Sequence, residues 1–188
     1  DNNYTSSVFN RFLENRETIA RRLEQKYTGQ LYPDKGFIHE QQLGKHPYHP
    51  GANHENGVNP NSADVLIPAF LAAYTGQNPD KIKTSPFPSV FRMLPNWRIT
   101  YNGLSRIPAV RKYIRSITLS HQYRCTYSVG AYSSFPDWLG SGEEELGYIQ
   151  SLSNGKPVPS SPYDIPSVSI TESFSPLLGI DISLLNHL

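Results

Sequence analysis

Two stretches of the chain alternate between apolar and polar residues over an unusual length. Ser116–Tyr132 carries its apolar side chains mostly on odd-numbered positions, and Ser167–Leu184 carries them mostly on even ones. Successive side chains of a strand point to opposite faces, so each stretch predicts a β-strand with one apolar and one polar face. Globular strands usually hold about 5 to 6 residues, whereas a tilted strand that crosses a bilayer needs about 9 to 11. The pattern is typical of an outer-membrane barrel, but a soluble antiparallel sheet with one wet face gives the same alternation.

Two helices are predicted before these strands. Residues 7–27 repeat apolar side chains at helical spacing and are followed by Gly29, and residues 62–75 do the same before Gly76. Pro68 should bend the second helix near its first turns, because proline removes a backbone donor. The segments between and after the helices are rich in Gly, Pro, Asn and His, which predicts a long ordered loop over 29–60 and an extended connector over 77–95.

A shorter strand is predicted over 97–104, and a short link over 105–115 joins it to the long strand, whereas residues 133–165 form a long connection rich in Gly and Pro. Outer-membrane barrels have short periplasmic turns and long outer loops. We therefore expect residues 1–95 to form an extracellular region with both helices. Residues 96–188 would hold barrel strands at about 97–104, 116–132 and 166–184, with 133–165 as an outer loop.

Three sets of side chains would have defined places in such a barrel. Aromatic residues at the outer strand ends would form an interfacial girdle: Trp97, Tyr132, Phe135, Trp138 and Tyr163. Small and nearly neutral side chains would line the lumen: Thr118, Ser120, Gln122, Arg124, Thr126, Ser128, Ser169, Thr171, Ser173, Ser175 and Asp181. His121 and Glu172 break the apolar faces, and a register in which facing residue numbers add up to 293 would make them a cross-strand polar pair. Pro176 cannot donate to a ladder, so a bulge or unpaired stretch is expected around 176–179.

Composition changes this picture little. Lys and Arg total 17 against 16 for Asp and Glu, so no net field favours nucleic acid or acidic lipid. The single cysteine, Cys125, has no partner for a disulfide. No apolar run is long enough for a transmembrane helix, and the start of the chain has neither an initiator Met nor a signal peptide, so we expect a piece of a longer protein.

No catalytic or cofactor-binding motif is apparent, and we expect neither enzymatic activity nor a cofactor. His46, His49, His54 and Glu55 lie close together in the sequence and could in principle bind zinc. Their spacing matches no known site pattern, and the prolines at 47 and 50 extend the backbone and separate the rings. The spacing therefore favours hydrogen-bonded loop histidines over a metal site.

Four motifs together carry a resemblance. They are D-V-L-I-P-A-F-L-A-A-Y-T-G (64–76), N-W-R-I-T-Y-N-G-L-S-R-I-P (96–108), S-I-T-L-S-H-Q-Y-R-C-T-Y-S-V-G (116–130) and I-P-S-V-S-I-T-E-S-F-S-P-L-L-G-I-D (165–181). In this order they resemble the SprA/Sov family of outer-membrane translocon barrels. That resemblance implies a mainly β fold, a fragment of a very large antiparallel transmembrane β-barrel with a helix-containing extracellular insertion at its N-terminal side.

The resemblance also implies a function. The chain would be a segment of the protein-conducting channel of the type IX secretion system, a membrane protein complex associated with gliding motility that exports folded cargo from the periplasm to the cell surface. The implied partners are the remainder of the same barrel chain, a PorV-type barrel protein at a lateral opening, a Plug protein, cargo with a C-terminal sorting domain, and the lipid bilayer. The alternative is a soluble extracellular β-rich module that binds a glycan or a peptide.

Overall fold

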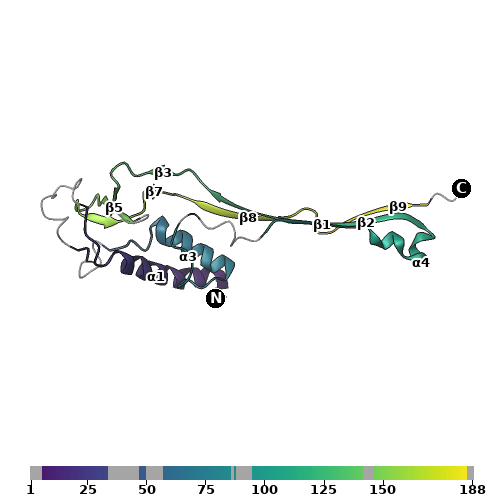
Figure 1. The fold of residues 1–188 in the computed structure, drawn as a ribbon, viewed down its shortest axis with the longest axis horizontal. Helices are drawn as coiled ribbons and strands as arrows, with labels where there is room; N and C mark the ends of the chain where they lie inside the picture. The colour runs from purple at the N-terminus through teal and green to yellow at the C-terminus, as the bar shows by residue number, and fades with distance from the viewer. Residues whose placement is uncertain are drawn as a thin grey trace, which may run out of the picture. The chain divides into compact units, whose positions relative to one another are not determined.

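The structure, a computed structural model, describes residues 6–33, 47–49, 57–85, 87, 95–141 and 146–185. The chain folds into two compact units. Unit 1 consists of Asp1–Arg92 and Val129–Ser167, and unit 2 consists of Met93–Ser128 and Val168–Leu188. Figure 1 labels most of the helices and strands of the two units.

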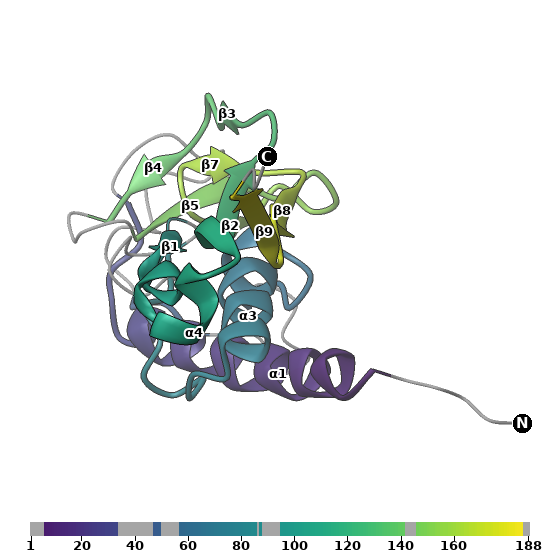
Figure 2. The ribbon, with the colours of Figure 1, turned by 90° about the vertical axis from the view of Figure 1, so that its right-hand side faces the viewer.

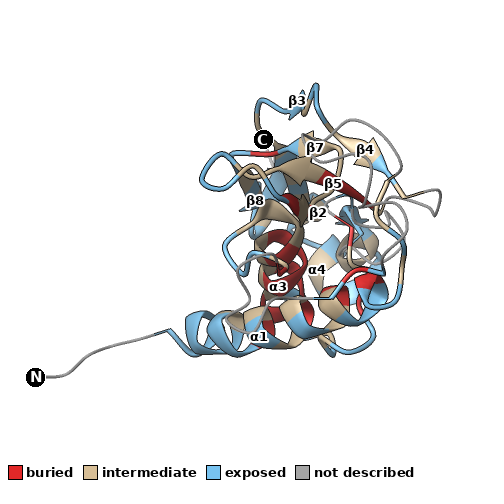
Figure 3. Ribbon diagram, turned by 90° about the vertical axis from the view of Figure 1, so that its left-hand side faces the viewer, coloured by how far each residue is buried: buried red, intermediate tan, exposed pale blue. Residues whose placement is uncertain are grey.

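Unit 1 is built around two helices that pack against each other, α1 (Ser7–Tyr27) and α3 (Ala63–Thr75) (Figure 1 and Figure 2). Their bounds agree with the helices predicted over 7–27 and 62–75. One stripe of α1 is buried, with Ile19, Leu23 and Tyr27 four residues apart, as helical spacing requires. The Asn15 side chain is also buried on this stripe, and its amide donates to the Ala69 carbonyl of α3 at 3.3 Å. Figure 3 shows the buried residues on the facing sides of both helices.

The α3 helix is almost entirely apolar and is buried over most of its length. Seven of its residues are buried, among them Pro68, and the helix continues past this proline to Thr75. It ends at Gly76, whose φ of 70° is left-handed and therefore suits glycine at a helix C-terminus. Among the described residues, no helix combines the length and the hydrophobicity needed to cross a membrane.

The segment expected to be an outer loop, 133–165, contains five short strands instead. They are β3 (Ser133–Ser134), β4 (Leu139–Gly140), β5 (Gly147–Gln150), β6 (Pro157–Pro159) and β7 (Tyr163–Asp164). Strand β3 pairs with β7, and β4, β5 and β6 form a small antiparallel sheet in that order. The Tyr27 hydroxyl donates to the Gly147 carbonyl at 3.0 Å and thereby joins α1 to β5. The sequence pattern did not predict these strands, because strands of two to four residues are too short to show periodicity.

Unit 2 is centred on one long strand, β2 (Ile114–Val129), which has 16 residues. On one side β2 pairs antiparallel with β1 (Trp97–Tyr101), and on the other with β8 (Val168–Phe174) and β9 (Gly179–Leu184). A short 3-10 helix (Gly103–Arg106) and α4 (Pro108–Arg111) connect β1 to β2. The expectation of a mainly β chain is wrong in its balance: about a third of the described residues are in strands and 28% are in helices, and the antiparallel sheets are not closed into a barrel.

Candidate functional site

The four-stranded sheet of unit 2 separates its side chains into two chemically different faces. Residues that face each other in an antiparallel pair point to the same side of the sheet. On one face, apolar and aromatic side chains stand in rows across three strands: Trp97–Tyr123, Ile99–His121, Tyr101–Leu119–Ile180 and Ile117–Ile182. The pairing therefore joins the apolar positions of separate sequence segments into one continuous surface.

This apolar face is exposed on both flanking strands. Ile99 and Tyr101 of β1 are 57% and 53% exposed, while Ile180 and Ile182 of β9 are each 55% exposed and Leu184 is 66% exposed. Isolated exposed leucines are ordinary on soluble proteins, but a contiguous apolar surface marks a protein, ligand or membrane interface. Within unit 2 the apolar face is thus the strongest candidate for a functional surface.

The opposite face carries hydroxyl and other polar side chains. Thr118 faces Asp181, Ser120 faces Gly179, and Gln122 faces Arg98. A Cβ at Gly179 would lie 2.4 Å from the Ser120 hydroxyl, so a larger residue there would require the Ser120 side chain to move. With one exception, the predicted lumen-facing residues lie in strands at positions that alternate with the apolar face: Thr118, Ser120, Gln122, Arg124, Thr126, Ser128, Ser169, Thr171, Ser173 and Asp181. The exception is Ser175, which lies in the turn between β8 and β9.

That turn, residues 175–178, interrupts the strand that pairs with β2. The Ser175 amide donates to the Gln122 carbonyl and the Gln122 amide donates to the Pro176 carbonyl, each at 3.1 Å. Facing residue numbers add up to 297 at Gln122 and Ser175 and to 299 along β9, so the turn inserts two extra residues. The interruption expected around 176–179 is therefore confirmed, one residue earlier than predicted.

The predicted pairing of His121 with Glu172 is wrong. The hydrogen bonds at the two ends of β8, from Ser175 to Gln122 and from Gly130 to Ser167, give facing numbers that add up to 297, not 293. The two side chains are therefore displaced from each other along the strands. Each has another partner: the Tyr123 hydroxyl donates to Glu172 Oε1 at 2.5 Å, and His121 Nδ1 lies 2.6 Å from the Leu177 carbonyl. The prediction assumed that the two polar groups must satisfy each other, whereas a tyrosine hydroxyl and a turn carbonyl satisfy them separately.

A second irregularity lies near the start of β2. Ile114 faces Leu184 and Ser116 faces Ser183, so the register shifts by one residue between these two pairs. The shift leaves Arg115 as the extra residue and brings Ile114, an even-numbered residue, onto the face of the odd-numbered ones. Sequence alternation missed this residue, because a one-residue bulge reverses the parity of the pattern.

The five residues predicted to form an aromatic girdle are divided between the two units. Trp97 belongs to unit 2 and stacks on Tyr123 at a centroid distance of 4.2 Å. The other four belong to unit 1, where Tyr132 and Tyr163 contact edge to face and the Trp138 indole donates to the Ser160 carbonyl at 2.8 Å. The fourth, Phe135, bonds through its backbone amide to the Pro162 carbonyl at 3.0 Å. Phe174, whose ring lies 5.1 Å from that of Tyr123, is the aromatic neighbour that the sequence pattern missed.

No family model matches the chain, and no curated protein is found to be similar to it. The candidates for a functional site are therefore the two faces of the sheet in unit 2 and the pocket in unit 1 described next.

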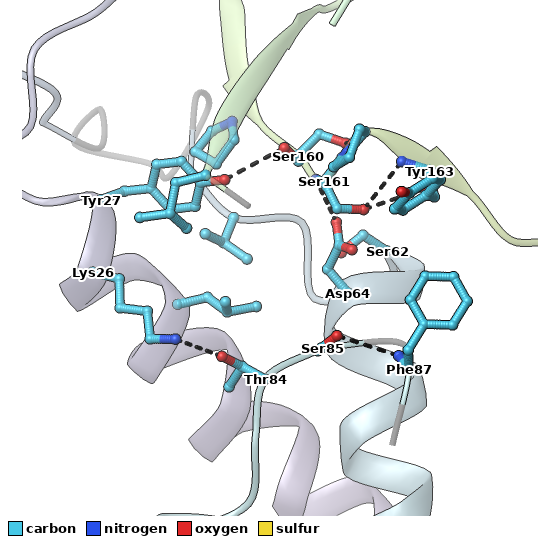
Figure 4. A pocket seen from close by; sticks show the side chains of 15 residues that line it. Lys26, Tyr27, Ser62, Asp64, Thr84, Ser85, Phe87, Ser160, Ser161 and Tyr163 are labelled. Atoms are coloured by element: carbon cyan, nitrogen blue, oxygen red, sulfur yellow. Dashed lines mark hydrogen bonds between the residues drawn. The ribbon is translucent and has the colours of Figure 1, made fainter. Parts of the chain in front are cut away.

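One pocket of unit 1 lies where α1, the start of α3 and residues 159–163 meet (Figure 4). The Asp64 carboxylate accepts from the Ser161 amide at 3.0 Å, and burial raises the pKa of this carboxyl although Ser161 partly offsets the effect. Lys26 Nζ lies 2.7 Å from Thr84 Oγ1. The cavity measures about 60 Å³, far below the roughly 300 Å³ of a small-molecule site. These polar groups serve to join the segments of unit 1.

Only one of the four residues considered as zinc ligands in the sequence lies in the part of the chain that the structure describes. His49 is among the described residues, whereas His46, His54 and Glu55 lie outside them. Within the part of the chain that the structure describes, no three His, Cys, Asp or Glu side chains are grouped as metal ligands.

Proposed function

We propose that this chain is a segment of a protein-conducting outer-membrane channel, the translocon barrel of the type IX secretion system. The observation that carries the proposal is the two-faced sheet of unit 2, whose apolar face is exposed on the flanking strands β1 and β9 while its other face is lined with hydroxyl groups. In a barrel wall the apolar face would contact lipid and the hydroxyl face would line the channel.

Energetics support lipid rather than water at the apolar face. Exposed apolar surface costs about 25 cal/mol per Å² relative to an apolar environment, so a continuous patch of isoleucine, leucine, tyrosine and tryptophan is unfavourable in water. The surface extends over nearly the whole of β1 and β9. Hydrocarbon removes this cost without requiring a complementary protein surface.

The polar face suits a conducting wall. Its side chains are mainly serine and threonine, with Arg98, Arg124 and Asp181 as charged groups. Hydroxyl groups keep water at the wall and offer a passing protein few strong contacts. Export through such a channel needs no bond chemistry from these residues.

The sheet also requires further polypeptide. A membrane-spanning sheet must have every backbone group paired, because no water is present to satisfy an open edge. Strand β1 pairs with β2 alone among the described strands, as do β8 and β9. The remainder of the barrel chain would complete these edges, with a PorV-type barrel protein, a Plug protein and secreted cargo as the proposed partners of the assembly.

A lipid-dissolved photoreactive probe tests the proposal. The full-length protein that contains this segment would be reconstituted in phosphatidylcholine vesicles, irradiated and digested, and labelled residues would be identified by mass spectrometry. We expect labelling at Ile99, Tyr101, Ile180 and Ile182 and none at the neighbouring Thr100 and Ser183. A stable monomer that stays in solution without detergent and takes up no label would refute the proposal and favour the soluble binding module.

A further inference from the structure

The length of β2 exceeds what a bilayer can cover. Its 16 residues extend about 50 Å at a rise of about 3.3 Å per residue. At the tilt of about 40° that membrane barrels adopt, this corresponds to roughly 38 Å along the bilayer normal, against an apolar band of about 25 Å. About a third of the strand must therefore lie outside the hydrocarbon layer.

The exposed fractions of the side chains indicate which third of β2 lies outside the hydrocarbon layer. The large apolar residues of the sheet that are exposed all lie between the Ile114 end of β2 and the row of Tyr123: Trp97, Ile99, Tyr101, Phe174, Ile180, Ile182 and Leu184. Beyond Tyr123 the same face carries Glu172, which is exposed, and then Tyr127 and Ile170, which are half-buried. A carboxylate in the first row past Tyr123 is unfavourable in hydrocarbon and ordinary in water.

The row of Tyr123 has the chemistry of an interface. Trp97 and Phe174 flank Tyr123, at ring distances of 4.2 Å and 5.1 Å. The Tyr123 hydroxyl points away from the aliphatic rows and donates to Glu172 at 2.5 Å. Tryptophan and tyrosine collect where apolar and wet surroundings meet, because each has an apolar ring and a polar tip.

The opposite end of the apolar rows has matching features. Tyr113, directly before β2, is 70% exposed. Exposed cationic side chains are carried by Arg115 in β2 and by Arg106 and Arg111 in the short helices that precede it. From Ile114 to Tyr123 the strand rises about 30 Å, or roughly 23 Å along the bilayer normal at the same tilt. This height agrees with one hydrocarbon layer.

Building on the proposed function, we propose that the lipid-contacting surface of this segment ends at the row Trp97–Tyr123–Phe174. Acyl chains cover the rows from Ile114 and Leu184 up to that row, and lipid headgroups lie beside the three aromatic rings. The part of β2 beyond Tyr123, together with β8 up to Glu172, stands above the hydrocarbon layer.

Depth-dependent fluorescence quenching tests this boundary. A genetically encoded fluorescent amino acid would replace Ile182, Ile170 or Thr100, one at a time, in the full-length protein reconstituted in vesicles. Lipids brominated on the acyl chains quench within the hydrocarbon layer, and iodide quenches from water. We expect bromolipids to remove roughly half of the fluorescence at position 182 and essentially none at 170, which iodide should quench instead. Thr100 lies on the polar face and should respond to iodide alone.

The outcomes separate the two proposals. Equal bromolipid quenching at positions 170 and 182 would overturn the boundary and leave the lipid-facing sheet standing. An absence of bromolipid quenching at 182, or its presence at 100, would refute the barrel wall itself and the boundary with it. Protease resistance of each variant reports folding, and Leu184 and Tyr127 provide second labelling sites below and above the boundary.

Discussion

The substitution Ile180→Arg should destabilise the protein in a bilayer far more than its exposure suggests. Ile180 is 55% exposed and faces Leu119, which lies midway between Ile114 and Tyr123 along β2. If those residues mark the limits of the hydrocarbon layer, Ile180 is near the bilayer midplane. An arginine on the lipid face costs about 2–4 kcal/mol there. On an exposed strand in water the same change typically stays within about 0.5 kcal/mol.

The assay is urea unfolding of the full-length protein reconstituted in vesicles, followed by tryptophan fluorescence. Ile180→Ala measures the free energy of unfolding that is lost with the packing of the isoleucine. The difference in this free energy between the Arg and Ala variants therefore gives the cost of placing the charge in lipid. Thr100→Arg introduces the same cation at nearly the same height on the polar face and should cost less than about 0.5 kcal/mol. If Ile180→Arg were no more destabilising than Ile180→Ala, the apolar face would be in contact with water and the lipid assignment would fail.

Three further predictions concern unit 1 and chemical unfolding. Tyr27→Phe removes a hydroxyl that bonds both backbone groups of Gly147, so it should cost about 1–3 kcal/mol, whereas Tyr132→Phe at an exposed position should cost under about 0.5 kcal/mol. Burial raises the pKa of Tyr48 and of Tyr148. As the pH rises, the unfolded chain therefore releases these protons at a lower pH than the folded chain does, and the free energy of unfolding should fall above about pH 10. A flat profile up to about pH 11 would contradict this. Burial also raises the pKa of Asp64, so Asp64→Asn should stabilise the fold near pH 7 but not near pH 3, where the wild-type carboxyl is already protonated.

The sequence predicts the elements whose periodicity is long. The helix over residues 7–27 and the alternation in β2 each repeat over several turns or strand pairs, so local pattern was sufficient to place them. The amphipathic pattern overstates burial at the N-terminal end of α1, where Val8, Phe9 and Leu13 remain exposed. Periodicity shows which face is apolar, and tertiary contacts decide how much of it is covered.

What the sequence could not show depends on non-local geometry. The register between β2 and β8 differs by four residues from the predicted one, because the long connection that precedes β8 leaves no periodic signal. The two residues inserted near Pro176 shift β9 by two more, and they leave no periodic signal either. The core of unit 1 gathers Tyr27, Tyr48 and Tyr148 from a helix, a loop and a short strand. Their ring centroids lie 5.4 to 5.9 Å apart, an arrangement that only the folded chain creates.

The two extra residues between β8 and β9 define which changes of chain length the sheet can tolerate. An even number of inserted residues preserves the side to which every later side chain points, so Ile180, Ile182 and Leu184 remain beside Leu119 and Ile117. Deleting one residue from 175–178 would turn those three toward the hydroxyl groups and place Asp181 and Ser183 among isoleucines. Homologous chains should therefore gain or lose residues here in pairs, and a single-residue deletion should be more damaging than the removal of two.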